Sequence, residues 1–597
     1  MKFAEEYYLN NIKQVKDELS SLEKILNRYA ALRLAIAIAA IISTYYCYKK
    51  DNFTLVVVSI TFGITAFLIA AFFHNNKINE KNKKLLLLKY NEKGIMRING
   101  EWKKFDDYGK EYIDKKHNFT NDLDIFGKNS LFQWINITNS QFGRNILAKM
   151  LRLDNIPSIN EVKNNQEAIK ELKDKRELCQ NIYLETCNDK YSDKNIDRFI
   201  QWMKGDKVIS LTPKYIPYLF LTVTYTILFF TIIRKIPISV LVLDLLINYL
   251  VIKVITRQTE EIVGLVLNNK RKIIQYTNVL AIIQKEEYIS KKLNTLKGKL
   301  VSARKNSVEE MGKLKNIINW LGDSTGNAYY LILNLFMMSD IFILHNLELW
   351  RKENGQDVEE WLNIMGEFEA LISLSNLAFE HELWNYPDVT DDFKIEAIEI
   401  GHPLLGERAK VNDFKLCGGE KAALITGSNM SGKSTFLRTI GFNMILAYLG
   451  VPVFAKDFKC GIFNIYTCMR TQDDLEENIS SFYAEILRIK LVIEAAKKGE
   501  KVFFLLDEIF KGTNSKDRHH GAQVLIEQLV AANGRGLVST HDLELCDLEK
   551  VHPWLVNYNF QEYYKDNKIK FDYKLRKGKS TTQNAKYLMK MAGIDME

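Results

Sequence analysis

Long apolar segments occur in two places along the chain, each time as a closely spaced pair. The first pair comprises residues 34–48 and 53–73, which are uncharged and separated by four polar residues. The second pair comprises residues 215–233 and 236–255, joined by two basic residues. A helix needs about 20 apolar residues to cross the hydrocarbon of a bilayer. The pattern therefore predicts two transmembrane helical hairpins.

The two pairs differ in how well they fit a membrane span. Residues 53–73 are long enough, and the segment before them reaches the required length from Tyr29 when Arg33 extends its guanidinium to the interface. The second pair carries Asp244 and Asn248 within its second helix. Polar residues in a membrane helix usually face a helical partner or another subunit. Buried hairpins in a soluble protein are the alternative, and it is stronger for the second pair.

Helix and strand patterns divide the remaining chain. Residues 122–181 are largely helical in pattern, and the charged amphipathic run 260–321 predicts an extended lever helix or a helical pair. Residues 358–382 place apolar side chains at three- and four-residue spacing, which predicts a helix packed on one face. From Ile395 onward, strand and helix patterns alternate as in an α/β domain.

The composition limits the number of domains and the cellular compartment but does not indicate a function. A chain of 597 residues is long enough for roughly three or four domains. Its net charge of +9 is compatible with nucleic acid or a membrane surface as a partner and demonstrates neither. The seven cysteines are scattered without a CxxC pair, so we expect no disulfide framework or cysteine metal site, which suits a reducing cytosol. The charged helical pattern at the N-terminus is unlike a signal peptide.

A complete phosphate-binding loop lies between the apolar strand pattern 422–425 and a helical pattern that begins at Thr435. Backbone N–H groups of such a loop surround the β-phosphate, and the helix N-terminus adds partial positive charge. Lys433 would reach the β- and γ-phosphates, and the Ser434 hydroxyl would hold Mg²⁺. The candidate ATP-binding residues are Gly427, Ser428, Asn429, Met430, Ser431, Gly432, Lys433, Ser434 and Thr435.

Two further strand ends supply candidate catalytic residues. The apolar strand 502–506 ends in Asp507 and Glu508. Asp507 would orient the Mg²⁺ shell, and Glu508 would polarise the attacking water. A third strand pattern ends at His541, which could hydrogen-bond the γ-phosphate or the water. Together with Lys433, these residues predict an ATPase site.

These motifs resemble the MutS family of DNA mismatch-repair ATPases. The family's phosphate loop appears as residues 426–435, with Ser428 in place of a proline. Its Asp-Glu-Ile-Gly-Arg-Gly-Thr appears as residues 507–513, and its Thr-His switch as Thr540-His541. Weaker similarity upstream includes Gly143-Arg144 in a helical core and the entry to the ATPase at residues 401–405.

The resemblance also implies a dimer with composite nucleotide sites. Ser480, before Ser481-Phe482 and Glu485, occupies the place of the serine that touches the partner subunit's γ-phosphate. Asn478-Ile479 stand where the family usually has Gly-Arg, so this chain departs from the pattern there. We therefore expect a homodimer through the ATPase domains, with Ser480 as a nucleotide-binding residue in trans.

The N-terminal region of the chain departs from the family. The family reads mismatches with a separate N-terminal domain that carries Phe-x-Glu, where this chain has the first apolar pair. Phe3-Ala4-Glu5 fits that motif but has no domain around it. Neither a mismatch-recognition domain nor a connector domain is expected.

The expected fold is an α/β P-loop ATPase domain of the ABC type, after a mostly α-helical MutS-type core and lever domain, with two transmembrane helical hairpins. The expected location is the cell (inner) membrane, multi-pass, with the ATPase domain in the cytoplasm. The expected segments are an N-terminal cytosolic helix (1–28), hairpin 1 (29–74), a linker (75–119), the first core segment (120–214), hairpin 2 (215–256), the lever with the second core segment (257–390) and the ATPase domain (391–597).

The sequence does not determine which molecule this ATPase acts on. By resemblance, the expected function is binding of mismatched or branched DNA and mismatch repair, with membrane lipid contacted by four helices. The alternative is an ATP-driven membrane switch or scaffold that binds an unknown protein partner and no DNA. An ABC-type transporter is disfavoured, because the membrane helices are few and the Leu-Ser-Gly-Gly-Gln signature is absent from the sequence.

Overall fold

The computed structural model describes residues 2–187, 194–205, 215–257, 259–301, 305–326, 328–470, 481–511, 514–565 and 568–580. The chain divides into two compact units. The first comprises Met1–Ile135, Leu151–Val162 and Ser375–Glu597, and the second comprises Asn136–Met150 and Lys163–Leu374.

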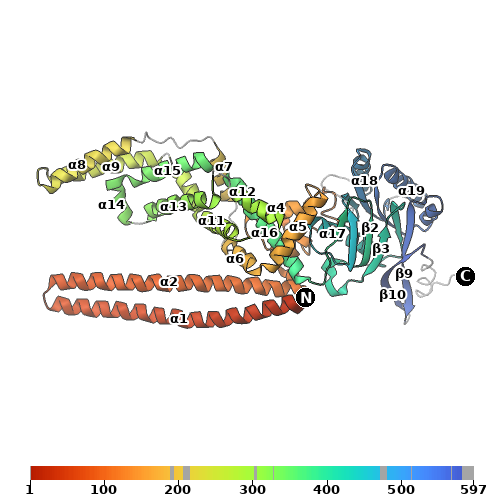
Figure 1. Cartoon of the computed structure of the whole chain (residues 1–597), viewed down its shortest axis with the longest axis horizontal. Coiled ribbons are helices and arrows are strands. Elements are labelled where there is room, and N and C mark those ends of the chain that lie inside the picture. Colours follow the sequence, from red (N-terminus) through yellow and green to blue (C-terminus); the bar gives the residue numbers. More distant parts are fainter. Residues whose placement is uncertain are drawn as a thin grey trace. The chain divides into compact units, whose positions relative to one another are not determined.

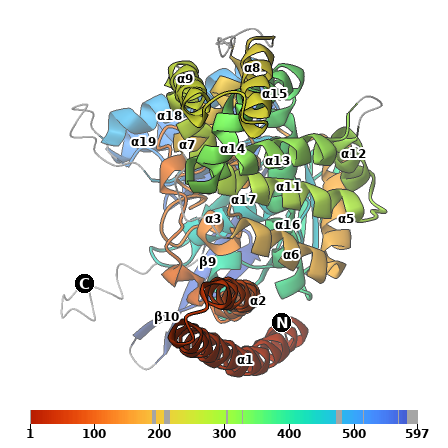
Figure 2. The same ribbon diagram turned by 90° about the vertical axis from the view of Figure 1, so that its left-hand side faces the viewer.

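The first unit begins with a long antiparallel hairpin of α1 (Lys2–Lys49) and α2 (Phe53–Ile98), seen along the helices in Figure 2. The N-terminal helix and the first apolar segment are one continuous helix, because nothing between them breaks the pattern. Likewise α2 continues to Ile98, so the expected linker 75–119 begins as helix. Gly63 permits close packing, since a Cβ there would lie 2.5 Å from the Cβ of Ala40.

The end of this hairpin nearest the N-terminus packs on the last turns of α16 (Val358–Glu380). Arg97 and Glu380 form a buried ion pair there, with Nη2 and Oε1 2.7 Å apart and both side chains almost fully buried. Tyr8 donates its hydroxyl to the same carboxylate at 3.0 Å, and Tyr90 donates to Asn376 at 3.2 Å. The hairpin is therefore joined to its unit by a polar cluster as well as by apolar packing.

The C-terminal region of the first unit is an α/β domain, as the alternating pattern predicts. Short elements precede it: η1 (Glu101–Lys104), η2 (Lys110–Tyr112) and α3 (Leu131–Ile135). Its elements are β1 (Asp388–Thr390), β2 (Ile395–Ile400), η3 (Pro403–Arg408), β3 (Asn412–Leu416), β4 (Ala422–Thr426), α17 (Lys433–Leu449), β5 (Asp457–Gly461), β6 (Asn464–Cys468), α18 (Ser481–Lys497), β7 (Val502–Asp507), α19 (Ser515–Ala531), β8 (Arg535–Thr540), η4 (Leu545–Lys550), β9 (Leu555–Lys565) and β10 (Lys568–Lys577).

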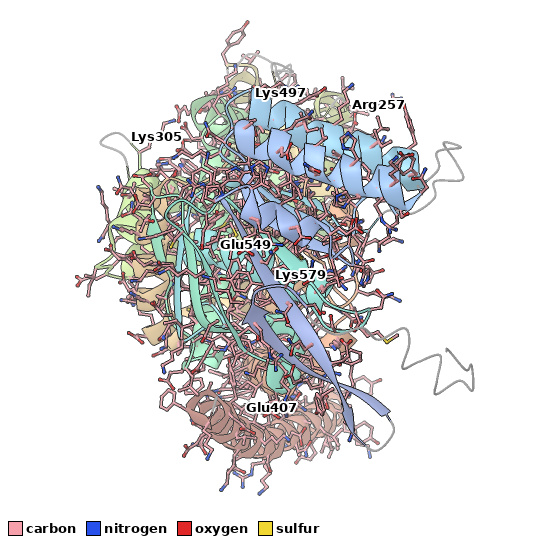
Figure 3. The ribbon with its side chains drawn as sticks, turned by 90° about the vertical axis from the view of Figure 1, so that its right-hand side faces the viewer. Arg257, Lys305, Glu407, Lys497, Glu549 and Lys579 are labelled. Carbon is pink, nitrogen blue, oxygen red and sulfur yellow. The ribbon has the colours of Figure 1, made fainter. Side chains whose placement is uncertain are left out.

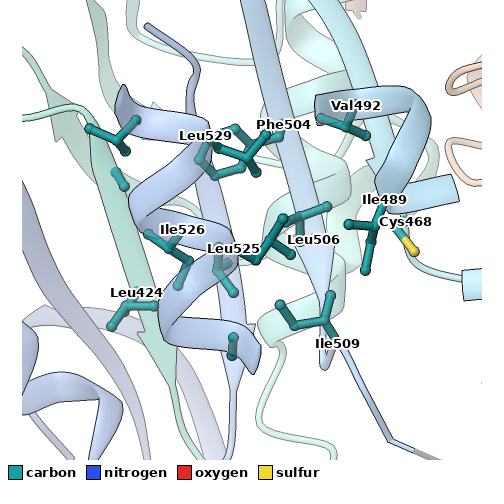
Figure 4. Close-up of a cluster of buried hydrophobic side chains, with 14 of the residues drawn as sticks. Leu424, Cys468, Ile489, Val492, Phe504, Leu506, Ile509, Leu525, Ile526 and Leu529 are labelled. Atoms are coloured by element: carbon teal, nitrogen blue, oxygen red, sulfur yellow. The ribbon is translucent and has the colours of Figure 1, made fainter. Parts of the chain in front are cut away.

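Two sheets form this domain within the described residues. The larger has the order β10-β9-β4-β8-β7-β6, and its strands are parallel except for β10. The smaller has the order β1-β5-β2-β3. Apolar side chains of the central strands pack against α18 and α19, as Leu506, Ile489 and Leu525 illustrate in Figure 4. Asn557 of β9 donates to Glu549 of η4 at 2.7 Å, and Figure 3 shows where Glu549 lies on this domain.

The second unit is helical, as Figure 1 shows. Four helices replace the extended lever helix or helical pair expected over residues 260–321, because the chain breaks at Asn269, around Tyr288 and at Val301. Its helices are most of α4 (Gln141–Arg152) and of α5 (Ile159–Asp174), then α6 (Arg176–Thr186), α7 (Lys194–Lys204), α8 (Tyr215–Ile232), α9 (Ile238–Arg257), α10 (Glu260–Asn268), α11 (Lys270–Lys285), α12 (Lys291–Leu300), α13 (Ser307–Gly326), α14 (Ala328–Met337), α15 (Ser339–Asn354) and the beginning of α16.

Several helices are apolar enough for a membrane. Within the described chain, α1, α2 and α9 are long and apolar enough to cross one, and α8 is a shorter apolar helix. The sequence patterns did not single out α14, which forms a fourth candidate together with α15 although the two are bent by 80°. These properties are compatible with the two expected hairpins.

Candidate active site

The phosphate-binding loop joins β4 to α17, in the strand–loop–helix order that the sequence predicts. Gly427 and Gly432 have φ of 145° and 108°, which favours glycine. A Cβ at Gly427 would lie 2.7 Å from Ser431 Oγ and 2.8 Å from the carbonyl of Phe560. Because the first N–H groups of a helix have no partner within it, the start of α17 offers donors to an anion.

Lys433 extends from the start of α17 back across the loop. Its Nζ donates to the carbonyls of Gly427 at 2.9 Å and Ser428 at 3.0 Å, and lies 3.4 Å from Glu508 Oε1. Only 4% of the residue is exposed, and this burial lowers the pKa of its ammonium, against the opposing effect of Glu508. Lys433 is thus held at the mouth of the loop, beside the acidic pair.

Glu508 follows β7 and is held by two more side chains. Its carboxylate lies 2.5 Å from His541 Nε2 and 2.7 Å from Lys511 Nζ. The hydrogen bond with His541 lowers the pKa of Glu508 far below the usual range, and Lys511 adds to this against the effect of burial. The carboxylate is therefore ionised at neutral pH, the state required of a group that polarises water.

Asp507 and Ser434 are the candidate metal residues. Parallel pairing of β7 and β8 sets Asp507 opposite Ser539, whose hydroxyl donates to Asp507 Oδ1. Ser434 is the second residue of α17 and is half-buried. Carboxylate and hydroxyl oxygens are the hard ligands that Mg²⁺ takes, so the donor chemistry fits this ion.

The structure brings some of the expected residues together and separates others. His541 Nε2 lies 2.7 Å from Asn429 Oδ1, so Asn429, Lys433, Glu508 and His541 form one cluster. The side chains of four other loop residues lie outside it: the Ser428 hydroxyl donates to Glu562 at 2.8 Å, Ser431 is buried against Gly427, Met430 is 85% exposed and Thr435 is exposed. Ser480 lies outside the described residues.

Three side chains near the site had no role in the sequence prediction. Lys511 contacts Glu508, and the Glu485 carboxylate accepts the N–H of Phe510, whose φ of 62° is left-handed. Tyr573 of β10 lies beside the loop, because a Cβ on Gly432 would lie 3.2 Å from its ring. Glu485 and Lys511 stand within the recognised motifs, so their positions were the available signal. No local pattern connects Tyr573 with the loop.

The strand order, the loop and the acidic pair together define a P-loop ATPase domain. Residues 423–596 match the family model for MutS domain V. The C-terminal region of the chain is therefore similar in sequence to the ATPase domain of the MutS family.

Curated relatives with similar sequences have MutS names. The chain is 31% identical over 235 residues to the DNA mismatch repair protein MutS of Persephonella marina, which covers 38% of this chain and 27% of that protein. It is 34% identical over 238 residues to the MutS of Acetivibrio thermocellus, with the same two coverages. It is 32% identical over 256 residues to human MutS protein homolog 4, covering 40% and 27%. The alignments thus span less than a third of these relatives' length.

Proposed function

We propose that the chain is a membrane-anchored MutS-type ATPase that hydrolyses ATP in composite sites of a homodimer. One observation supports the chemistry above all others: Lys433, Glu508, His541 and Asn429 converge at the phosphate-binding loop. A loop alone binds a nucleotide, whereas a loop facing an ionised carboxylate can also direct water at its γ-phosphate.

In the proposed reaction, water attacks the γ-phosphorus in line with the bond to the β-bridging oxygen, which breaks to give ADP and phosphate. Glu508 orients the water and takes its proton, and His541 hydrogen-bonds Glu508 or the phosphate. Lys433 stabilises the negative charge of the transferred group. Ser434 and Asp507 would hold Mg²⁺, which supplies positive charge to the phosphate oxygens when bound. Ser480 of one protomer would reach the other's nucleotide.

The Glu508→Gln substitution tests the catalytic assignment. We expect turnover to fall by about a hundred-fold or more, the usual contribution of a general base, while ATP binding persists. Steady-state phosphate release and binding of a fluorescent ATP analogue would measure the two. Glu494→Gln, which changes an exposed carboxylate of α18, is the matched control. Unchanged turnover in Glu508→Gln would contradict the proposed role.

Exposed apolar surface supports the membrane component of the proposal. Large apolar side chains on the first hairpin face outward, including Ile41 at 70% exposure, Phe53 at 81% and Phe62 at 76%. Contiguous apolar surface of this kind is costly in water and suits acyl chains. Four helices, α1, α2, α8 and α9, would make the chain a multi-pass protein of the cell (inner) membrane with the ATPase domain in the cytoplasm. Carbonate-resistant flotation of the full chain with lipid vesicles tests this, and recovery in the soluble fraction would contradict it.

The names of the relatives favour DNA as the molecule that this chain binds. Those names describe DNA mismatch repair proteins, and on that basis we propose that this chain binds mismatched or branched DNA in mismatch repair. The test is a salt titration of binding to mismatched, branched and plain duplex DNA. Steep salt dependence and a preference for branched or mismatched DNA are expected. Absence of binding at low salt would exclude this cargo.

The buried Arg97–Glu380 pair favours the second candidate, an ATP-driven membrane switch or scaffold with a protein partner and without DNA. This pair joins the first hairpin to α16, in the same compact unit as the ATPase domain. A conformational change in the ATPase domain would therefore reach the hairpin through this contact as well as along the chain. A DNA-independent change of ATPase rate on reconstitution into bilayers would support the switch.

A further inference from the structure

The second unit contains an apolar helix that ends beside the middle of the α8–α9 hairpin. Asn248, the eleventh of the twenty residues of α9, donates from Nδ2 to Thr224 Oγ1 of α8 at 2.8 Å and to the carbonyl of Leu335 in α14 at 3.1 Å. Asn248 and Thr224 are both fully buried. The C-terminal end of α14 therefore lies at half the height of this hairpin.

The chain turns sharply at this point and continues as α15. Met338, between the two helices, is buried and left-handed with φ of 50°, and the helices are bent by 80°. Beyond the bend, Ile341 packs with Ile252, four residues nearer to the Arg257 end of α9 than Asn248. Phe342 lies 5.2 Å, ring to ring, from Tyr218 near the start of α8. Thus α15 runs back toward the end at which α8 begins and α9 ends.

The helix before α14 comes from that same end. A Cβ on Gly322 of α13 would lie 2.5 Å from Nζ of Lys270, and Lys270 begins α11, which the nine-residue helix α10 connects to the end of α9. The chain therefore comes to α14 from the end of the hairpin at which α8 begins and α9 ends, and returns to the same end through α15. With ten residues, α14 is about 15 Å long, roughly half the thickness of the hydrocarbon.

Side chains satisfy the backbone where the helix breaks. The Leu335 carbonyl lies in the last turn of α14 and accepts from Asn248. Asn334 donates from Nδ2 to the Asp340 carboxylate at 2.7 Å and accepts the N–H of Asp340 at 3.1 Å, which caps the start of α15. In hydrocarbon, a helix break is tolerated only where protein groups replace water in this way. Asn248 in an otherwise apolar helix thus has a specific partner.

The outer surface of α14 is apolar and continues that of its neighbours. Leu331 is 53% and Ile332 61% exposed, comparable with Leu246 of α9 at 55%. We propose that α14 is a re-entrant membrane helix, which enters the bilayer beside α8–α9, ends near its middle against Asn248 and returns as α15, with acyl chains covering Leu331 and Ile332. This inference rests on the proposed membrane insertion of the second hairpin.

Cysteine accessibility in the full chain tests the proposal. Leu331→Cys and Ile332→Cys proteins are reconstituted in lipid nanodiscs and treated with a membrane-impermeant maleimide, and labelling of each introduced cysteine is read from its peptide by mass spectrometry. Ile289→Cys, at a site 92% exposed outside the apolar helices, is the labelled control. Leu246→Cys is the lipid-facing control. We expect a loss of labelling at Leu331, Ile332 and Leu246 relative to Ile289.

The outcomes separate this inference from the proposed anchoring. Labelling of the Leu331 and Ile332 positions at the rate of Ile289, with Leu246 protected, would overturn the re-entrant helix and leave the hairpin in the membrane. Labelling at Leu246 as well would overturn the membrane placement of the hairpin itself, and the re-entrant helix with it. Adding Asn248→Leu to Leu331→Cys is expected to increase labelling, whereas Val242→Leu, on the exposed face of α9, should not. Equal labelling in both would overturn the role of Asn248.

Discussion

His381 illustrates how a single side chain links packing to solution conditions. It stacks on Trp384 with the ring centroids 4.2 Å apart and contacts the edge of Trp134 at 5.2 Å. Burial among these rings lowers the pKa of His381 to about 3, and the charge of Arg97 acts in the same direction. The folded protein therefore keeps this imidazole neutral at a pH where an ordinary histidine carries a proton.

The expected consequence is a loss of stability in mild acid. Between pH 6.5 and about 3 the unfolded chain binds a proton at His381 that the folded chain does not, so the free energy of unfolding decreases as pH falls, by up to about 1.4 kcal/mol per pH unit. His381→Phe should make this dependence less steep between pH 7 and pH 5. Denaturant unfolding in detergent, followed by tryptophan fluorescence, measures it. The exposed His520→Gln is the control, and an unchanged slope in His381→Phe would refute the assignment.

At the scale of elements, the contact between the first hairpin and α16 contains one buried ion pair. Arg97 donates from Nε to both carboxylate oxygens of Glu380, at 2.8 and 3.0 Å, and Tyr8 donates to the same group. Removal of one member of a buried pair leaves the other charge without a partner and costs about 3–5 kcal/mol. Glu380→Leu should therefore lower the melting temperature, and much of the loss should return in the double variant Arg97→Leu/Glu380→Leu.

Differential scanning fluorimetry in detergent would measure the melting temperatures of the unsubstituted protein, Glu380→Leu and the double variant. The exposed pair Lys81–Glu23 on the same hairpin provides the control, because Lys81→Gln should change stability by less than about 1 kcal/mol. A Glu380→Leu protein as stable as Lys81→Gln would show that the buried pair does not hold the hairpin.

The helices and strands differ in how well the sequence predicts them. The strands at 422–426 and 502–507 and the phosphate loop between strand and helix follow from local patterns, and the structure contains them. The ten residues of α14 were missed because a short apolar run with a bend after it resembles a buried core helix. In the run 260–321, neither glycine nor proline occupies the positions at which one helix ends and the next begins. These breaks therefore depend on packing with other parts of the chain.

Within the site, the residues predicted from motifs are those in the phosphate loop and at the end of a β-strand. Glu508 and Lys433 were identified in this way, and they lie 3.4 Å apart. The contact of Tyr573 with the loop depends on how distant segments fold together. Such contacts have no periodic signal in one sequence.

At the scale of the whole molecule, a composite site predicts that the nucleotide controls assembly. ATP bound between two ATPase domains would stabilise the dimer by mass action, and a protein unable to hydrolyse it should stay associated. We expect Glu508→Gln in detergent with ATP and Mg²⁺ to have twice the mass of one chain by sedimentation velocity. Lys433→Met, which loses a charge at the loop, should not respond to ATP. An equal mass for Glu508→Gln with and without ATP would contradict assembly by nucleotide.

The length of α2 has a consequence for where the ATPase domain would work. With residues 53–73 in the hydrocarbon, the rest of the helix to Ile98 rises about 37 Å from the bilayer surface. Charged side chains line this stretch of the hairpin, where Lys84 pairs with Glu18 at 2.5 Å. Screening in physiological salt acts over about 8 Å. The hairpin would therefore act as a spacer that places its docking point on α16 beyond the electrostatic influence of the lipid headgroups, so that the charge of the lipids would have little effect on what the domain binds.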